Sequence, residues 1–233
     1  MAGTSRTPSR RDRRLARAER QRAAERRRQQ RRSLGFALAA TAIVAVVFVL
    51  SSGLLGPDSG AGPIKASAAR DVSVAGPARS DPLAVGDEVP SFSAPGFRMV
   101  MTGSRARIRR DPFDWATYAG SPTVLSIWAS WCPHCQRELP LLADAVAGTP
   151  NVRLVTIVTS IGAHPGPTPS QYLAEQDLTF PVAIDDAEGT IAHAFGVEVF
   201  PTLYFVDASG AVTYASEGEV SSDVLRQQLE RLS

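Results

Sequence analysis

The two cysteines of the chain stand two residues apart, in the segment Trp131-Cys132-Pro133-His134-Cys135. This segment follows an apolar run that predicts a buried strand, and it opens a predicted helix. A thiol at a helix N-terminus faces unpaired N–H groups and the positive end of the helix dipole, so it ionises more readily than a free thiol. Proline in the first turn costs the helix no hydrogen bond. We therefore expect Cys132 to attack a partner's disulfide and Cys135 to resolve the mixed disulfide.

Three other uses of a close cysteine pair fit this sequence less well. A zinc site needs two further ligands, whereas His134 lies inside the pair and His164 and His193 lie far along the chain. Covalent haem attachment needs a histidine directly after the second cysteine, where the chain has Gln136. A structural disulfide would close a loop too short to constrain the unfolded chain much. We expect no metal and no bound cofactor, because the redox-active disulfide of the pair is itself the reactive group.

The elements that must hold the pair alternate along residues 123–232. Apolar or β-branched runs predict strands at 123–129, 152–159, 180–184, 202–206 and 211–215. Helices are predicted at 133–147, 170–176, 189–195 and 220–232, the last with Ser221 or Ser222 as its N-cap. An alternation that ends in a hairpin and a helix is typical of a three-layer α/β sandwich.

The charge of the chain is unevenly distributed, and its first part predicts a membrane anchor. Residues 1–33 contain 13 arginines and three acidic residues, whereas residues 34–233 contain 12 basic and 20 acidic residues. Residues 34–56 form an uncharged run of 23 residues. As a helix this run is about 34 Å long, enough to cross a hydrocarbon core of about 30 Å. The positive-inside rule places the basic tail in the cytoplasm and residues 57–233 outside a plasma membrane crossed once.

A cleaved signal peptide is the alternative interpretation of this region, because it also combines a basic segment with an apolar run. The run is longer than usual for a signal peptide, and the nearest Ala-x-Ala triplet, at 66–68, lies well beyond it. We expect the basic tail to act as a topology signal. The overall net charge of +2 conceals this tail and gives no reason to expect nucleic-acid binding.

Composition divides the rest of the chain into two parts. Residues 57–85 are dominated by Gly, Pro, Ser and Ala and contain no aromatic residue, so they predict a flexible linker. Residues 86–233 contain all three tryptophans and carry 9 arginines and 17 acidic residues, and they predict one folded domain. The cluster Arg105, Arg107, Arg109 and Arg110 is either a docking patch or a solvated edge or hairpin, and we favour the edge.

The chain resembles the thioredoxin superfamily, and within it the membrane-anchored TlpA/ResA/CcmG branch of the AhpC/TSA-redoxin type. The residues that carry the resemblance are the segment 127–135, Glu138-Leu139-Pro140 shortly after it, Phe200-Pro201-Thr202 just before a predicted strand, and the segment 85–97. The resemblance covers the whole predicted domain. It implies a thioredoxin-like α/β/α sandwich with a central mixed sheet, preceded by one transmembrane helix.

The resemblance also implies roles for individual residues. Cys132 is the nucleophile and Cys135 the resolving thiol. Pro201 is a cis-proline that faces the disulfide, and it forms a substrate groove with Phe200 and Thr202. The residues that shield or tune the dithiol are Trp131, Pro133 and His134.

One position departs from the pattern of thioredoxins, which carry a buried acid six residues before the first cysteine. This chain has Ser126 there, and serine is no general base at ordinary pH. Glu138, another acid or water must then assist Cys135, or the resolving step is slower. We expect Glu138 itself to be a solvated helix residue.

The direction of electron flow stays open at this point. The Pro-His dipeptide is that of strongly oxidising DsbA-type proteins, because a charged imidazole stabilises the thiolate. The rest of the domain looks TlpA-like, a branch usually assigned to reduction, and the 65 residues between Cys135 and Pro201 are too few for a DsbA-type helical insertion. We favour a reductase over an oxidase.

Two other functions fit the sequence less well than disulfide exchange. Peroxidases of related type carry a Pro-x-x-x-Thr/Ser-x-x-Cys pattern, but Leu125 and Ala129 occupy its key positions here. A non-catalytic binding module tethered to the membrane would not need both cysteines. We therefore expect an extracytoplasmic disulfide oxidoreductase. By resemblance, its partners are apocytochrome c or other exported cysteine proteins, and a membrane protein that resets its redox state.

Overall fold

The computed structural model describes residues 64–67, 69–103 and 105–233 of the chain. The basic tail predicted for 1–33 and the membrane helix predicted for 34–56 lie outside the described residues. Within the described part, no helix is both long enough and apolar enough to cross a membrane. The membrane anchor therefore stays a prediction.

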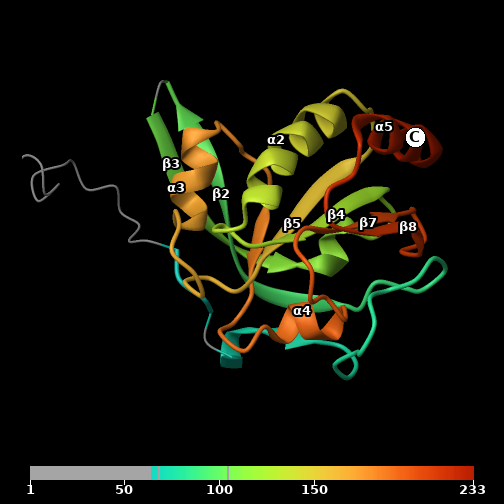
Figure 1. Ribbon diagram of the computed structural model, residues 1–233, viewed down its shortest axis with the longest axis horizontal. Coiled ribbons are helices and arrows are strands. Elements are labelled where there is room, and N and C mark those ends of the chain that lie inside the picture. Colours follow the sequence, from blue (N-terminus) through green and yellow to red (C-terminus); the bar gives the residue numbers. More distant parts are fainter. Residues whose placement is uncertain (1–63, 68, 104) are drawn as a thin grey trace, which may run out of the picture. The chain divides into compact units, whose positions relative to one another are not determined.

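A mixed β-sheet forms the middle layer of the domain (Figure 1). Its strands follow the order β1-β2-β6-β5-β4-β7-β8, and β3 pairs with β2. The strands are β1 (Ser73–Val74), β2 (Phe92–Thr102), β3 (Arg105–Asp114), β4 (Thr123–Trp128), β5 (Arg153–Val158), β6 (Val182–Ile184), β7 (Thr202–Val206) and β8 (Val212–Glu217). Strand β4 lies between parallel β5 and antiparallel β7, and all six of its residues are buried because both its faces are covered.

Helices cover both faces of this sheet. On one face lie α2 (Pro133–Ala147), α3 (Pro169–Glu175) and α5 (Ser222–Leu232), and on the other lies α4 (Thr190–Ala194) (Figure 1). Each face has its own apolar core, with Leu139 and Leu229 in one and Ile191 and Phe195 in the other. Two short 3-10 helices, η1 (Ala69–Asp71) and η2 (Trp115–Tyr118), complete the domain. The expected three-layer α/β/α sandwich with a mixed sheet is confirmed.

The strands and helices predicted for 123–232 agree with the structure to within two residues at each end. Helix α2 spans the predicted residues and contains Pro140. Helix α5 is capped by Ser221, whose hydroxyl accepts a hydrogen bond from Val224 N at 3.3 Å. These segments are predictable because their periodicity and their caps are local properties of the sequence.

Strands β2 and β3 form a long hairpin at one edge of the sheet. Ten residue pairs join them, whereas β6 pairs with β2 only at Gly96 and Phe97. The arginine cluster lies on β3, and Arg109 forms an ion pair with Asp111 at 3.1 Å. This placement agrees with the solvated edge or hairpin that we favoured for the cluster.

Residues 64–67 and 69–85 are tied to the domain, so the flexible linker predicted for 57–85 is wrong over these residues. Ile64 and Leu83 are only 1% and 2% exposed, and each belongs to one of the two apolar cores. Ser67 N donates to Asp185 O at 2.9 Å, which ties the segment to the chain just after β6. The packed domain therefore begins before residue 86.

The physical reason for this error lies in how single side chains anchor a segment. A stretch rich in Gly, Pro, Ser and Ala cannot build its own core. It can still add isolated apolar side chains to a core that other elements build. Leu83 does this, and its N–H also donates to the Tyr204 hydroxyl at 3.3 Å. Anchors of this kind leave no periodic pattern in the sequence.

Leu83→Ala should lower the free energy of unfolding by about 2–5 kcal/mol, because it removes buried methyl groups and leaves a cavity. Val85 supplies a matched control, since it is 68% exposed and only two residues away. Val85→Ala should change the free energy by less than about 0.5 kcal/mol. Urea unfolding of the full-length chain, followed by tryptophan fluorescence, measures both values. If Leu83→Ala changes the free energy of unfolding as little as Val85→Ala does, the packing of Leu83 is contradicted and the prediction of a flexible linker stands.

Candidate active site

Helix α2 begins at the carboxyl end of β4, and this junction positions both cysteines. Cys132 is the N-cap residue, with φ −80° and ψ 116°, and Pro133 occupies the first turn. Gln136 N donates to Cys132 O at 3.1 Å. Both cysteines are free thiols, and Cys132 is 5% exposed whereas Cys135 is fully buried. The thiol predicted to attack is thus the more accessible of the two.

The loop before β7 faces Cys132. The Phe200–Pro201 peptide bond is cis, as the resemblance implies. Cys132 Sγ donates to Phe200 O at 3.5 Å, and Thr202 Oγ1 donates to Val199 O at 2.7 Å. Residues predicted to form a substrate groove are therefore brought to the predicted nucleophile from a segment far along the chain.

Trp131 is held by the loop between β5 and α3. Its Nε1 donates to Ser160 O at 2.8 Å, and its ring lies edge-on to His164, with the ring centroids 4.3 Å apart. A Cβ at Gly166 would lie 2.9 Å from Trp131 Cα, so the loop backbone packs directly against this residue. The sequence predicted the loop but not its contacts with Trp131, which no local pattern reveals.

His134 belongs to a polar cluster with Arg137 and Glu219. Its Nδ1 lies 2.8 Å from Glu219 Oε1 and 2.8 Å from Arg137 Nη2, and Arg137 Nη2 also donates to Glu219 Oε1. No hydrogen bond joins His134 to Cys132 in the part of the chain that the structure describes. Glu219 lies between β8 and α5, and sequence reasoning missed it because nothing local links it to the cysteine pair.

Glu138 is buried, so its expected place as a solvated helix residue is wrong. It is 3% exposed, its Oε1 accepts from Val220 N at 2.7 Å, and its Oε2 has no hydrogen-bond partner. Burial, together with the negative charge of Glu219, raises the pKa of Glu138 to about 7 despite the bond from Val220. One signal could have revealed this position. Glu138 follows Cys135 by three residues, so both lie on the same face of α2.

Cys135 lies in an environment that disfavours its thiolate. Burial raises its pKa far above the usual range, and the nearby Cys132 and Glu138 raise it further. Ser126 is fully buried in β4, and its hydroxyl has no hydrogen-bond partner. The carboxyl that acts electrostatically on Cys135 is therefore that of Glu138, whose pKa suits proton exchange near neutral pH.

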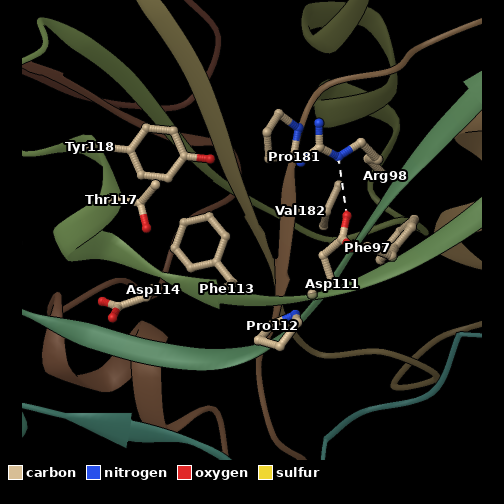
Figure 2. A pocket seen from close by; sticks show the side chains of 11 residues that line it. Phe97, Arg98, Asp111, Pro112, Phe113, Asp114, Thr117, Tyr118, Pro181 and Val182 are labelled. Atoms are coloured by element: carbon tan, nitrogen blue, oxygen red, sulfur yellow. Dashed lines mark ion pairs between the residues drawn. The ribbon is translucent and has the colours of Figure 1, made fainter.

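A small cavity of about 100 Å³ lies at the base of the β2–β3 hairpin. Figure 2 shows Phe113 and Tyr118 on one side of it and Arg98 on the other, with Arg98 paired to Asp111 at 3.4 Å. None of the predicted site residues lines this cavity. Among the described residues, no group of three or more His, Cys, Asp or Glu is placed to hold a metal ion.

Comparison with known proteins gives a family match and several relatives. The AhpC/TSA family matches residues 85–215, a range that includes every predicted site residue. A soluble secreted antigen of Mycobacterium tuberculosis is 32% identical over 126 residues, which are 52% of this chain and 69% of that protein. The thiol-disulfide oxidoreductase ResA of Geobacillus thermodenitrificans is 25% identical over 150 residues, covering 64% of this chain and 79% of ResA.

A solved structure shares the fold. The crystal structure of a putative thiol:disulfide interchange protein DsbE from Chlorobium tepidum matches with a TM-score of 0.52 and 26% sequence identity. The match covers 64% of this chain and 98% of that one. This similarity agrees with the thioredoxin-like fold implied by the sequence resemblance.

The buried carboxyl of Glu138 should make stability depend on pH. Its pKa is about 7 in the folded chain, against a usual value of 4.5. Between these values the unfolded chain loses a proton that the folded chain retains, so the wild type loses stability as pH rises. Glu138→Gln lacks this penalty. Its stability relative to wild type should therefore increase by about 2–3 kcal/mol between pH 5 and pH 8.

Urea unfolding in reducing buffer at both pH values measures this difference. Glu175→Gln is a suitable control, because Glu175 is exposed at the end of α3 and its replacement should leave the pH dependence unchanged. A constant difference between Glu138→Gln and wild type would contradict the burial of the carboxyl.

Proposed function

The chain belongs to the AhpC/TSA family and is a protein-disulfide oxidoreductase, and from that premise we propose that Cys132 and Cys135 are its exchanging dithiol. The proposal rests on one observation. Two segments far apart in the sequence, the start of α2 and the loop at Phe200–Pro201, come together at the Cys132 sulfur. The Cys132 thiol stands at the start of α2 and donates to the Phe200 carbonyl beside Pro201 at 3.5 Å. This carbonyl belongs to a loop that can offer backbone pairing to an extended substrate segment.

The proposed reaction proceeds in two exchange steps. In the first, the Cys132 thiolate attacks a substrate disulfide, forms a mixed disulfide and releases one substrate thiolate. In the second, Cys135 loses its proton and attacks the Cys132 sulfur, which releases the second substrate thiolate. Two electrons pass from the dithiol to the substrate, and the protein is left with a Cys132–Cys135 disulfide. An external dithiol must then reduce that disulfide before the next cycle.

Glu138 is the group proposed to accept the proton of Cys135. The raised pKa of Cys135 means that the thiol rarely ionises unaided near neutral pH. Glu138 exerts a charge effect on Cys135, and its own pKa of about 7 lets it accept and release a proton at neutral pH. Ser126 cannot take this part, because a hydroxyl does not act as a base at ordinary pH.

We favour reduction of the substrate as the direction of electron flow. The oxidising tendency of the Pro-His dipeptide depends on a charged imidazole acting on the thiolate. Here the hydrogen bonds of the His134 ring go to Glu219 and Arg137 instead. A DsbA-like oxidase is the second candidate, and the Pro133-His134 dipeptide is the observation that favours it.

The cellular setting is part of the same proposal. Residues 34–56 anchor the chain in the plasma membrane, and the domain works on the extracytoplasmic side. Exported proteins with cysteines, apocytochrome c among them, are the substrate class, and a membrane protein restores the dithiol. No bound cofactor is needed, because the two thiols carry both electrons.

Replacing Cys132 should abolish disulfide exchange, whereas replacing Cys135 should trap mixed disulfides. Cys132→Ala should reduce disulfide exchange to the uncatalysed background, because no attacking thiolate remains. Cys135→Ala should form mixed disulfides that persist, because the resolving thiol is missing. Non-reducing gels of cells producing each variant reveal the trapped species, which should be recovered with the membrane fraction. The double variant is the control and should trap nothing.

Full activity of Cys135→Ala would contradict the two-step mechanism. Cellular phenotypes that persist unchanged in Cys132→Ala would favour the non-catalytic binding module.

The reduction potential of the full-length chain decides between the two directions. A reductase should equilibrate with glutathione buffers near the thioredoxin value of about −270 mV or below it. A value near −120 mV, at the DsbA end of the scale, would instead identify a disulfide donor. Thiol alkylation followed by gel shift measures the reduced fraction at each buffer ratio.

A further inference from the structure

Three successive residues between β8 and α5 contact three different parts of the site. Gly218 N donates to Pro201 O at 2.7 Å, in the loop that faces Cys132. Glu219 contacts His134 and Arg137 in the first turns of α2. Val220 N donates to the buried carboxyl of Glu138 at 2.7 Å. The segment 218–220 thus fixes Glu219 from both sides, because each of its neighbours is held by a backbone hydrogen bond.

Glu219 and Arg137 together hold the imidazole of His134 whether or not its Nδ1 carries a proton. Nδ1 is equally far from Glu219 Oε1 and Arg137 Nη2, at 2.8 Å. A protonated Nδ1 donates to the carboxylate, and an unprotonated Nδ1 accepts from the guanidinium. Arg137 also donates to Glu219, so the three side chains form a closed cluster. The ring therefore keeps its place in both states.

A carboxylate next to this ring opposes the effect usually attributed to a histidine between two active-site cysteines. A charged imidazole stabilises the neighbouring thiolate, and so stabilises the reduced form. Glu219 places a negative charge at hydrogen-bond distance from the same imidazole. The thiolate then experiences the pair of charges and not the imidazole alone. The side chain of Glu219 is 35% exposed, so solvent weakens this effect without removing it.

We propose that Glu219 is a positioning residue that holds His134 in the cluster with Arg137 and offsets its charge, so that the dithiol is less oxidising than its Pro-His dipeptide alone would make it. The inference deepens the proposed function, since it requires Cys132 and Cys135 to be the exchanging pair. It also gives a chemical reason why a protein with the Pro133-His134 dipeptide acts as a reductase.

The test compares Glu219→Gln with the wild-type, full-length chain in glutathione buffers at pH 6. In this equilibrium two glutathione thiols are oxidised to one glutathione disulfide, and their two electrons reduce the Cys132–Cys135 disulfide. At pH 6 the carboxyl of Glu138, with its pKa of about 7, is mostly protonated in the wild type. Loss of the Glu219 charge lowers that pKa, and the measurement at pH 6 limits the effect of this change.

Glu219→Gln should shift the equilibrium toward the dithiol by about two- to fivefold, the size expected for a half-exposed charge pair. For a two-electron couple this equals a change of about 9 to 21 mV in the oxidising direction. Glu217→Gln is the matched control, because it removes the same charge two residues earlier in the chain and contacts neither His134 nor Arg137. In a His134→Ala background, the effect of Glu219→Gln should become smaller, because only the direct effect of the Glu219 charge on the thiolate remains.

No shift, a shift in the reducing direction, or the same shift with and without His134 would overturn the inference. These outcomes are distinct from a failure of the proposed function. If wild-type Cys132 and Cys135 do not form a disulfide in these buffers at all, the proposed function fails. If the wild type equilibrates normally and Glu219→Gln matches it, only the role of Glu219 fails.

Discussion

The junction between β4 and α2 is the constraint on which the rest of the site depends. Strand β4 is buried along its whole length, so its end is a fixed point in the domain. Helix α2 starts five residues later, and Cys132 is its N-cap. The chain thereby leaves one thiol slightly accessible, with Cys132 5% exposed, and buries the other fully one turn later. This difference in exposure supports the proposed order of reaction, in which the more accessible thiol meets the substrate first.

Most of the framework could be predicted from local properties of the sequence. The apolar run of β4, the proline at the start of α2 and the serine cap of α5 each lie within a few residues of the element they define. The cysteine pair was recognised for the same reason. Phe200 and Pro201 could be placed at the site only through resemblance, since 65 residues separate Cys135 from Pro201 and no periodicity connects them.

The features that were missed depend on packing between distant segments. Ile64 and Leu83 enter cores that strands and helices far along the chain create. Glu138 is charged in isolation and was therefore expected in water, but the approach of Val220 buries it and gives it a backbone donor. Spacing alone would have placed Glu138 on the same helix face as Cys135. The spacing does not show which segment covers this face of α2.

In the proposed mechanism, that covering segment lets Glu138 take the part of the acid that the chain lacks at position 126. A carboxyl close to a buried thiol must itself be buried, and burial is costly unless the charged form finds a donor. Val220 N supplies one donor to one carboxyl oxygen, while the other oxygen stays without a partner. The carboxyl is thus held near the balance between its two protonation states. With two donors it would remain ionised and serve poorly as a proton source, and with none it would remain protonated and serve poorly as a base.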